Sequence, residues 1–390
     1  MKNQYIYLDN VSTMFPKPKL VLDYMQDSLS IYGSPGRGSH AFAKLANDYV
    51  HQVRTKLAQI FNVPYPEHVI FTQSATHGLN TIIKGYFNYG DHALVCHYSH
   101  NAVLRPLAKL KHRGVIDYDI FDISESGDID EVQISKLIKT NTRIIICNHA
   151  SNVTGTYLKI DQVSKIAKNY GLHILLDCTQ SALYKDIDVV HDGIDFLVGA
   201  GHKSFMGPSG VGFMYIKDET LIDQLMDGGS DGNSSISPVH PQFLPYKFET
   251  GTMNFIGIAG LNGALDHISA VGIAHIRKQV KSLTDYAIHD LSQIKQLQIY
   301  SPATIANRAP IISINLNGLN PSIVAHLLDL RFGICVRSGI HCAPLIHKTL
   351  NTIPEGTLRI SFSHVNTIEE ILQLIYAIQS IISEEIVCKN

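Results

Sequence analysis

The chain contains 390 residues, and 45% of them are hydrophobic, which is enough to build a large core and to form two domains. Its formal net charge of -2 at pH 7 leaves no basic surplus for binding nucleic acid or an anionic membrane. No apolar run reaches the length of a membrane-spanning helix, the first ten residues lack the regions of a signal peptide, and six irregularly spaced cysteines suit free thiols in a reducing compartment. We therefore expect a cytoplasmic protein without nucleic-acid or membrane partners.

Five short apolar runs in the first half of the chain predict buried β-strands. The runs are continuous rather than alternating, as in strands covered on both faces, and they span residues 68–72, 93–97, 143–147, 173–177 and 194–201. Around them, apolar residues at helical spacing predict amphipathic helices at 46–60 and 160–170. This order of elements predicts an α/β fold, with a mainly parallel central sheet and helices on both faces.

The pattern changes after a Gly- and Ser-rich segment at 227–238. The remaining chain predicts a long helix near 261–294, a strand at 309–316, a helix opened by Asn320 and Pro321, and a last helix capped by Thr367 and Glu370. These elements predict a smaller α+β domain. We expect a large domain at 1–255 and a small domain at 256–390, with the N-terminal segment packing on the small one.

Several polar residues follow the predicted strands. Asp177 ends one strand, His202 and Lys203 follow another, and two more strands are followed by His100 and Asn152. One such residue is more often part of a turn, but five at one edge of a parallel sheet predict a ligand crevice. Lys203 lies among small and apolar residues, where desolvation lowers the pKa of a lysine and allows it to form a Schiff base.

Eight segments carry a family resemblance, in order along the chain: YLDNVSTMFPKP, SPGRGSHAFAKLA, HASNVTGTYLKI, LLDCTQSA, GAGHKSFMGPSGVGFMYI, FETGTMNFIGIAGL, RSGIHCAP and GTLRISFSHVNTIEEI. Together they resemble the class V aminotransferases, and within that group the Suf-type cysteine desulfurases and selenocysteine lyases. The resemblance runs from Tyr7 to about Glu370. It implies fold type I of the pyridoxal 5'-phosphate (PLP) enzymes, PLP as the cofactor, and a small C-terminal domain that carries a cysteine loop.

The resemblance implies that residues of the crevice hold the PLP ring. Lys203 would carry PLP as a Schiff base and later move the Cα proton of the substrate. Asp177 would pair with the pyridine nitrogen, and Gln180 would bond the ring hydroxyl. Asn152 would lie beside that hydroxyl, and His100 would stack on the ring as a further catalytic residue.

The resemblance also implies a phosphate site and a homodimer. The phosphate would rest on the backbone of Ala75 and Thr76, where a helix begins, with the Thr76 hydroxyl and His202 as further donors. In this family the residue at the position of Thr252 reaches the phosphate bound by the neighbouring subunit. A dimer with shared sites is therefore expected.

The C-terminal motifs imply the substrate and the reaction. Arg359 would clamp the substrate carboxylate, and Arg337 and Asn152 would line the same pocket. Cys342 stands where the family has a thiolate that attacks the sulfur of L-cysteine, which leaves a persulfide on the enzyme and releases L-alanine. A free thiol is mostly protonated at neutral pH, so His341 or a nearby cofactor group would have to deprotonate it. The short cysteine loop further implies a partner protein that accepts the sulfur.

Three segments depart from the family pattern. Ala200 replaces a serine or threonine that bonds the phosphate, Val11 and Ser12 replace a small pair of alanines near the substrate pocket, and the segment around Met253 lacks a common proline. These departures bear on cofactor affinity and substrate specificity. They leave Lys203 and Cys342 intact.

Other functions also fit parts of the sequence. A selenocysteine lyase, or a class V aminotransferase or lyase for another amino acid, would use the same PLP residues, and the latter would not need Cys342. A binding or scaffold protein on a retired PLP fold would need no chemistry at all. His97 and His100, or His341 and His347 with Cys342, could suggest a metal site, but no CxxC pair supports one, so we expect no metal. We expect the other cysteines to be structural: Cys96, Cys147, Cys178, Cys335 and Cys388.

Overall fold

The computed structural model describes residues 5–36, 38–230, 236–302 and 308–389, so part of the Gly- and Ser-rich segment lies outside the described residues. The described helices are α1 (Lys19–Ile31), α2 (Ala41–Ile60), α3 (Ala75–Tyr86), α4 (Asn101–His112), α5 (Glu131–Leu137), α6 (Ile160–Tyr170), α7 (Phe255–Val271), α8 (Ile273–Ser292), α9 (Pro321–Phe332), α10 (Pro344–Thr349) and α11 (Ile368–Lys389). The described strands are β1 (Ile6–Tyr7), β2 (Val69–Thr72), β3 (Asp91–Cys96), β4 (Ile116–Phe121), β5 (Thr142–Asn148), β6 (His173–Asp177), β7 (Phe196–Ala200), β8 (Gly212–Ile216), β9 (Leu297–Ile299), β10 (Ile311–Leu316), β11 (Ile334–Cys335), β12 (Arg337–Gly339) and β13 (Thr357–Ser361).

Seven strands form the large sheet, in the order β2-β8-β7-β6-β5-β3-β4. β8 runs antiparallel to its neighbours β2 and β7, and all other neighbouring strands are parallel. The five predicted strands are all present, whereas β4 and β8 were not predicted. β4 is an edge strand with exposed and half-buried positions, so it lacks the continuous apolar run of a central strand.

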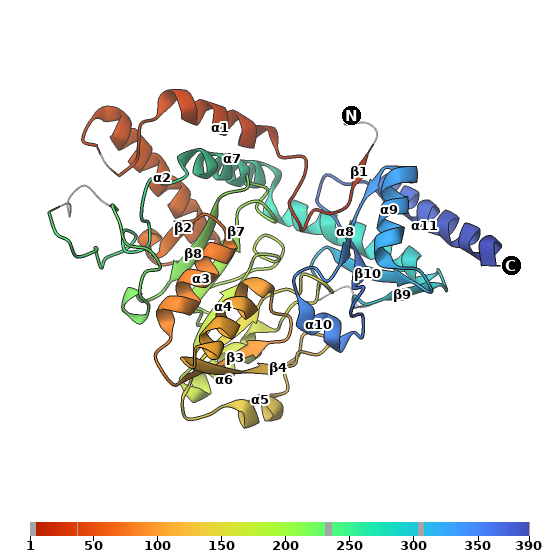
Figure 1. Ribbon diagram of the computed structural model, residues 1–390. Coiled ribbons are helices and arrows are strands. Elements are labelled where there is room, and N and C mark those ends of the chain that lie inside the picture. The colour runs from red at the N-terminus through yellow and green to blue at the C-terminus, as the bar shows by residue number, and fades with distance from the viewer. Residues whose placement is uncertain (1–4, 37, 231–235, 303–307, 390) are drawn as a thin grey trace.

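Helices cover both faces of the large sheet. Successive residues along its strands belong to two separate hydrophobic cores, one on each face. Leu94 and Ile145 belong to the core beneath α2, α6 and α7. The next residues along the chain, Val95 and Ile146, belong to the core beneath α3 and α4. Figure 1 shows α3 and α4 in front of the strands. The predicted α/β class, with a mainly parallel sheet between helices, is confirmed.

The long helix predicted near 261–294 is in fact two helices, because the chain turns at Gly272. The φ angle of Gly272 is +90°, a conformation that suits glycine. α7 is largely buried in the core of the large sheet, whereas α8 continues into the small domain. Among the described residues no single helix is long and apolar enough to cross a membrane; α7 and α8 reach that length and composition only as a pair bent by 82°.

The small domain is built on a four-stranded antiparallel sheet in the order β12-β13-β10-β9. α8, α9 and α11 pack on this sheet and form a separate core. β1 pairs in parallel with β11, so the N-terminal segment lies on the small domain before the chain enters α1. Since α7 packs with the large sheet, we propose that the two domains divide at Gly272 rather than between 255 and 256.

Candidate active site

The predicted crevice residues gather at the carboxyl ends of the large sheet. Asp177 is the last residue of β6, Asn152 follows β5, and Lys203 follows β7. His100 caps α4, directly after β3, and its Nδ1 accepts a hydrogen bond from the backbone N–H of Ala102 at 3.0 Å. The charges of Asp177 and Lys203 both act on the His100 ring, and the charge of Asp177 acts on Lys203. The three side chains therefore lie near one another at this edge of the sheet.

The Lys203 amine is less basic than an ordinary lysine. Burial disfavours its ammonium form, and the positive charges of Arg359 and Arg337 add to this effect, so the pKa of Lys203 falls to about 8. Asp177 acts in the opposite direction without cancelling the shift. With such a pKa, roughly a tenth of the amine is neutral at pH 7. A neutral amine is the form that attacks a carbonyl group.

Two donors hold the carboxylate of Asp177, which is only 5% exposed. Its Oδ1 accepts from the backbone N–H of Thr179 at 2.9 Å, and its Oδ2 accepts from Nδ2 of Asn148 at 3.1 Å. A fixed, buried carboxylate at the end of β6 suits the pairing of a cationic ring nitrogen.

Several buried polar atoms around the crevice have no hydrogen-bond partner within the described residues: Oδ1 of Asn152, Oγ1 of Thr179, Nδ1 of His202 and Nε of Arg359. Asn152 nevertheless uses its Nδ2, which donates to the carbonyl of His341 at 2.7 Å. Buried polar groups in proteins are nearly always hydrogen-bonded. Their grouping here fits a polar ligand in the crevice.

The predicted phosphate site lies at the start of α3, which begins at Ala75. The Ser74 hydroxyl caps this helix by accepting from the backbone N–H of His77 at 3.1 Å. The N–H groups of Ala75 and Thr76 precede that bond, and in a first helical turn they have no partner in the helix, so they suit an anion. Burial and two nearby lysines lower the pKa of His202 to about 4, so this ring is neutral near pH 7 and keeps one N–H to donate.

Two arginines lie opposite each other on β12 and β13. The Arg359 side chain is only 1% exposed and donates to the Asp9 carboxylate at 3.0 Å, to the Ser12 hydroxyl at 2.8 Å and to the carbonyl of Asn152 at 3.0 Å. Arg337 donates to the same Ser12 hydroxyl at 3.1 Å. Two guanidinium groups held this close suit a carboxylate ligand. The contacts of Asp9 and Ser12 were not predicted, although both residues lie in the YLDNVST motif.

Cys342 is exposed on the loop before α10, and two hydrogen bonds tie this loop to the large domain. The carbonyl of Cys342 accepts from the backbone N–H of Asn101 at 2.7 Å, and the carbonyl of His341 accepts from Asn152 at 2.7 Å. His341 and Cys342 have φ angles of +50° and +59°, in the left-handed region that non-glycine residues rarely adopt. Because Asn101 directly follows His100, the loop holds the thiol-bearing residue beside the crevice.

His341 is a poor candidate for deprotonating Cys342. Its ring is buried, and Nε2 lies 3.1 Å from the carbonyl oxygen of Thr357, so this nitrogen carries the hydrogen and donates it inward. Burial, followed by the charge of Arg359, lowers the pKa of His341 to about 2. An imidazole with so low a pKa is a very weak base. The sequence predicts either His341 or a nearby cofactor group as the base for the Cys342 thiol, and we therefore keep the cofactor group as the prediction.

Thr252 is exposed, unlike the buried residues of the crevice. It lies on the loop before α7 and borders a cavity of about 160 Å³ that Gln73 and His77 also line. The loop starts from a buried ion pair, in which both carboxylate oxygens of Glu249 accept from Arg54 at 2.8 Å. The position of the loop is thus fixed, while the Thr252 side chain remains accessible.

The residues that depart from the family pattern are all packed against the large or the small domain. Ala200 and Val11 are buried, and Met253 packs against the core of the large sheet. The backbone carbonyl of Val11 accepts from Nε2 of Gln180 at 3.3 Å. Within the described part of the chain, no three His, Cys, Asp or Glu side chains are grouped so that they could hold a metal ion.

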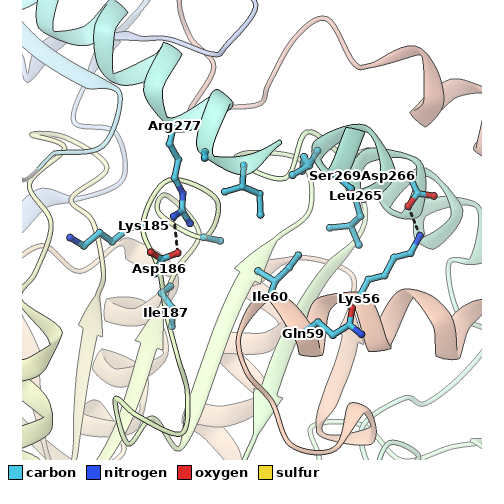
Figure 2. Close-up of a pocket in the computed structure, with 14 residues that line it drawn as sticks. Lys56, Gln59, Ile60, Lys185, Asp186, Ile187, Leu265, Asp266, Ser269 and Arg277 are labelled. Atoms are coloured by element: carbon cyan, nitrogen blue, oxygen red, sulfur yellow. Dashed lines mark hydrogen bonds and ion pairs between the residues drawn. The ribbon is translucent and has the colours of Figure 1, made fainter. Parts of the chain in front are cut away.

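A separate cavity of about 680 Å³ lies between α2, the loop at 182–187 and the junction of α7 with α8 (Figure 2). Apolar and polar side chains both line it, including two ion pairs: Lys56 with Asp266 at 2.5 Å, and Arg277 with Asp186 at 2.7 Å. None of the predicted site residues lines this cavity. We therefore place the chemistry at the strand ends.

The sequence profile of the family described as "Aminotransferase class-V" matches residues 6–374. The chain belongs to this family. Class V aminotransferases depend on PLP, so the protein is a PLP enzyme, and the predicted family and cofactor are confirmed. The Suf-type branch remains a prediction.

Several relatives and solved structures that are similar over nearly the full chain are named cysteine desulfurases. The chain is 32% identical over 374 residues to a "Probable cysteine desulfurase" of Methanothermobacter thermautotrophicus, which covers 94% of this chain and 92% of the relative. It is 30% identical over 390 residues to a "Cysteine desulfurase" of Yersinia pestis, with 96% and 93% covered. The apo structure of a cysteine desulfurase from Thermococcus onnurineus NA1 superposes with a TM-score of 0.90 at 29% identity, covering 98% of this chain and 96% of that one.

The residues of the crevice fit PLP. The unpartnered polar atoms, the fixed carboxylate of Asp177 and the amine of Lys203 supply the partners that its ring and aldehyde need. The start of α3 and the neutral ring of His202 supply donors for its phosphate. The assignment of each residue to its contact with PLP is a proposal that follows from this fit.

Proposed function

We propose that the protein is a cysteine desulfurase, which converts L-cysteine to L-alanine and keeps the sulfur as a persulfide on Cys342. The observation that carries this proposal is the exposed Cys342, which hydrogen bonds hold beside His100 at the PLP crevice. Purified protein supplied with cysteine and a reductant should release sulfide and alanine in equal amounts. Alanine without sulfide, or neither product, would contradict the proposal.

PLP supplies one kind of chemistry when bound: it withdraws electrons from the Cα of an amino acid. Lys203 would hold PLP through its side-chain amine. The Lys203 amine, whose pKa burial lowers to about 8, would move the Cα proton of the substrate. Asp177 would pair with the ring nitrogen, and Arg359 and Arg337 would hold the substrate carboxylate.

The sulfur step uses this chain's own thiolate. Sγ of Cys342 forms a bond to the substrate sulfur, while the bond between that sulfur and Cβ breaks and its electron pair returns to the carbon. Cβ then takes a proton, which balances the proton that the Cys342 thiol gave up when it became a thiolate, and we propose that Lys203 returns the proton that it removed from Cα. One cysteine and one enzyme thiol thus become one alanine and one enzyme persulfide.

Two other enzyme functions remain as alternatives on the same PLP residues. A selenocysteine lyase would release selenium faster than sulfur, and an aminotransferase or lyase for another amino acid would not require the thiol of Cys342. An amino-acid screen that measures alanine, sulfide and selenide separates the three. The exposed position of Cys342 favours the desulfurase.

We propose that the enzyme is a homodimer. A patch of large apolar side chains is exposed at the end of α1 and the start of α2: Leu29, Ile31, Phe42 and Leu45. The ring of Tyr32, next to this patch, lies 5.3 Å from the ring of Phe255, and Phe255 follows the Thr252 loop. A second copy that covers the patch would thus also meet Thr252, which supports the role of Thr252 at the phosphate of the neighbouring subunit.

Thr252→Ala should weaken PLP binding by roughly 1 to 2 kcal/mol, the worth of one hydrogen bond to a charged group. Thr250→Ala is the matched control, because the Thr250 hydroxyl donates to the carbonyl of Met226 at 3.2 Å. Equilibrium titration with PLP measures both affinities, and sedimentation should show a dimer for all three proteins. A fully active wild-type monomer would refute the shared site.

The rate at which PLP reattaches to the apoenzyme should rise about tenfold per pH unit below pH 7 and level off above about pH 8. Only the neutral amine of Lys203 attacks, and burial lowers the pKa of this amine from 10.5 to about 8. Absorbance after mixing apoenzyme with PLP measures the rate. A rate that keeps rising steeply to pH 10 would contradict the lowered pKa.

We also propose that the enzyme acts in the cytoplasm and passes its sulfur to an acceptor protein. All five cysteines with described side chains are free thiols: Cys96, Cys147, Cys178, Cys335 and Cys342. A reducing compartment keeps such thiols reduced. The exposed position of Cys342 would allow a second protein to reach its persulfide.

A further inference from the structure

We propose that Asn148 is a positioning residue for PLP, which acts by orienting the carboxylate of Asp177 toward the ring nitrogen. The inference rests on the proposed role of Asp177 and adds a residue outside the predicted set. Asn148 ends β5 and lies in register with Asp177, which ends the neighbouring parallel strand β6. Both side chains are about 95% buried, so water does not replace the contact between them.

The Asn148 amide is the side chain on which the orientation of the carboxylate depends. Its Nδ2 donates to Oδ2 of Asp177 at 3.1 Å, whereas the donor to Oδ1 is the backbone N–H of Thr179. The backbone donor alone would let the carboxylate rotate about one fixed oxygen. The second hydrogen bond fixes the plane of the group, and with it the direction of the lone pairs that meet a ring N–H.

Cys96 holds the Asn148 amide in the orientation that this role needs. The backbone N–H of Asn148 donates to Sγ of Cys96 at 3.3 Å, and the Cys96 thiol donates to Oδ1 of Asn148 at 4.0 Å. Because Oδ1 faces the thiol, Nδ2 faces the carboxylate. Cys96 is fully buried, so this cysteine, expected to be only structural, has a defined contact behind the crevice.

Asn148→Leu and Asn148→Ala in the full-length enzyme test the proposal, since both remove the donor and only the first preserves the size. Each should weaken PLP binding at least about tenfold, the loss expected for a hydrogen bond to a charged group. Each should also shift the visible absorption maximum of the bound cofactor, because the ring nitrogen is less firmly protonated. Cys96→Ala should cause a smaller change in the same direction.

Asn262→Leu is the matched control, because Asn262 is a buried asparagine on α7 whose Oδ1 accepts from Lys56 at 2.7 Å. It should keep the wild-type PLP affinity and spectrum, even where its thermal unfolding temperature falls. If Asn148→Leu fails to fold, Asn148→Ala decides. Wild-type affinity and spectrum in the folded Asn148 variants, or losses equal to that of Asn262→Leu, would overturn the proposal.

The test is independent of the proposed substrate, because PLP binding and the absorption spectrum are measured without cysteine. A wild-type protein that binds PLP but releases no sulfide would refute the desulfurase function and leave the role of Asn148 standing. Normal sulfide release by the wild type, together with unchanged PLP binding in the Asn148 variants, would refute the role of Asn148 and leave the desulfurase function standing.

Discussion

Cys342→Ser should release sulfide from cysteine at least about 100-fold more slowly than the wild type, because a hydroxyl is a far weaker nucleophile toward sulfur than a thiolate. The variant should still bind PLP and cysteine, since Lys203, Asp177 and Arg359 are unchanged. Sulfide release in the presence of dithiothreitol measures the first effect, and the visible spectrum with added cysteine measures the second.

Cys335→Ser is the matched control for this experiment. Cys335 is a half-buried free thiol on β11 of the same small domain, in register with Tyr7 of β1. The control should keep wild-type turnover. If Cys342→Ser also kept it, the thiol would not be the nucleophile, and the aminotransferase or lyase alternative would replace the desulfurase.

Lys203→Ala should lose turnover by roughly 10² to 10⁴-fold, because the group that moves the Cα proton disappears together with the covalent anchor of PLP. In the wild type, borohydride reduction followed by peptide mapping should find the pyridoxyl group on the peptide that contains Lys203. Added PLP should not restore the rate of the variant, since free cofactor does not replace the missing amine.

Lys185→Ala provides the comparison, because Lys185 is an exposed lysine that lines the separate cavity of Figure 2. In this variant the pyridoxyl group should still be found on Lys203, and the turnover rate should match that of the wild type. A pyridoxyl label on a lysine other than Lys203, or turnover that survives in Lys203→Ala, would remove Lys203 from the mechanism.

The central strands were predictable because each is a continuous apolar run that no other local structure explains. β8 was missed because it follows a glycine- and proline-rich segment, and its pairing with β2 joins residues far apart in the sequence. The break at Gly272 was missed for a related reason: apolar spacing continues across it, and only the positive φ of the glycine separates α7 from α8.

The site residues that could be predicted are those whose motifs resemble a known family, such as Lys203, Asp177 and Cys342. The resemblance does not say what holds these residues in place. Asn148 reaches Asp177 only because β5 and β6 are neighbours in register. Asp9 meets Arg359 only because the N-terminal segment lies on the small domain. Such contacts follow from tertiary packing and have no local sequence signal.

Mass spectrometry of the wild-type protein after reaction with one equivalent of cysteine, without reductant, tests the central claim most directly. The peptide that contains Cys342 should gain the mass of one sulfur atom, lose it again on treatment with dithiothreitol, and show no gain in Cys342→Ser. Alanine formed in the same sample should match the sulfur bound. A protein that forms alanine while the Cys342 peptide keeps its original mass would contradict the account.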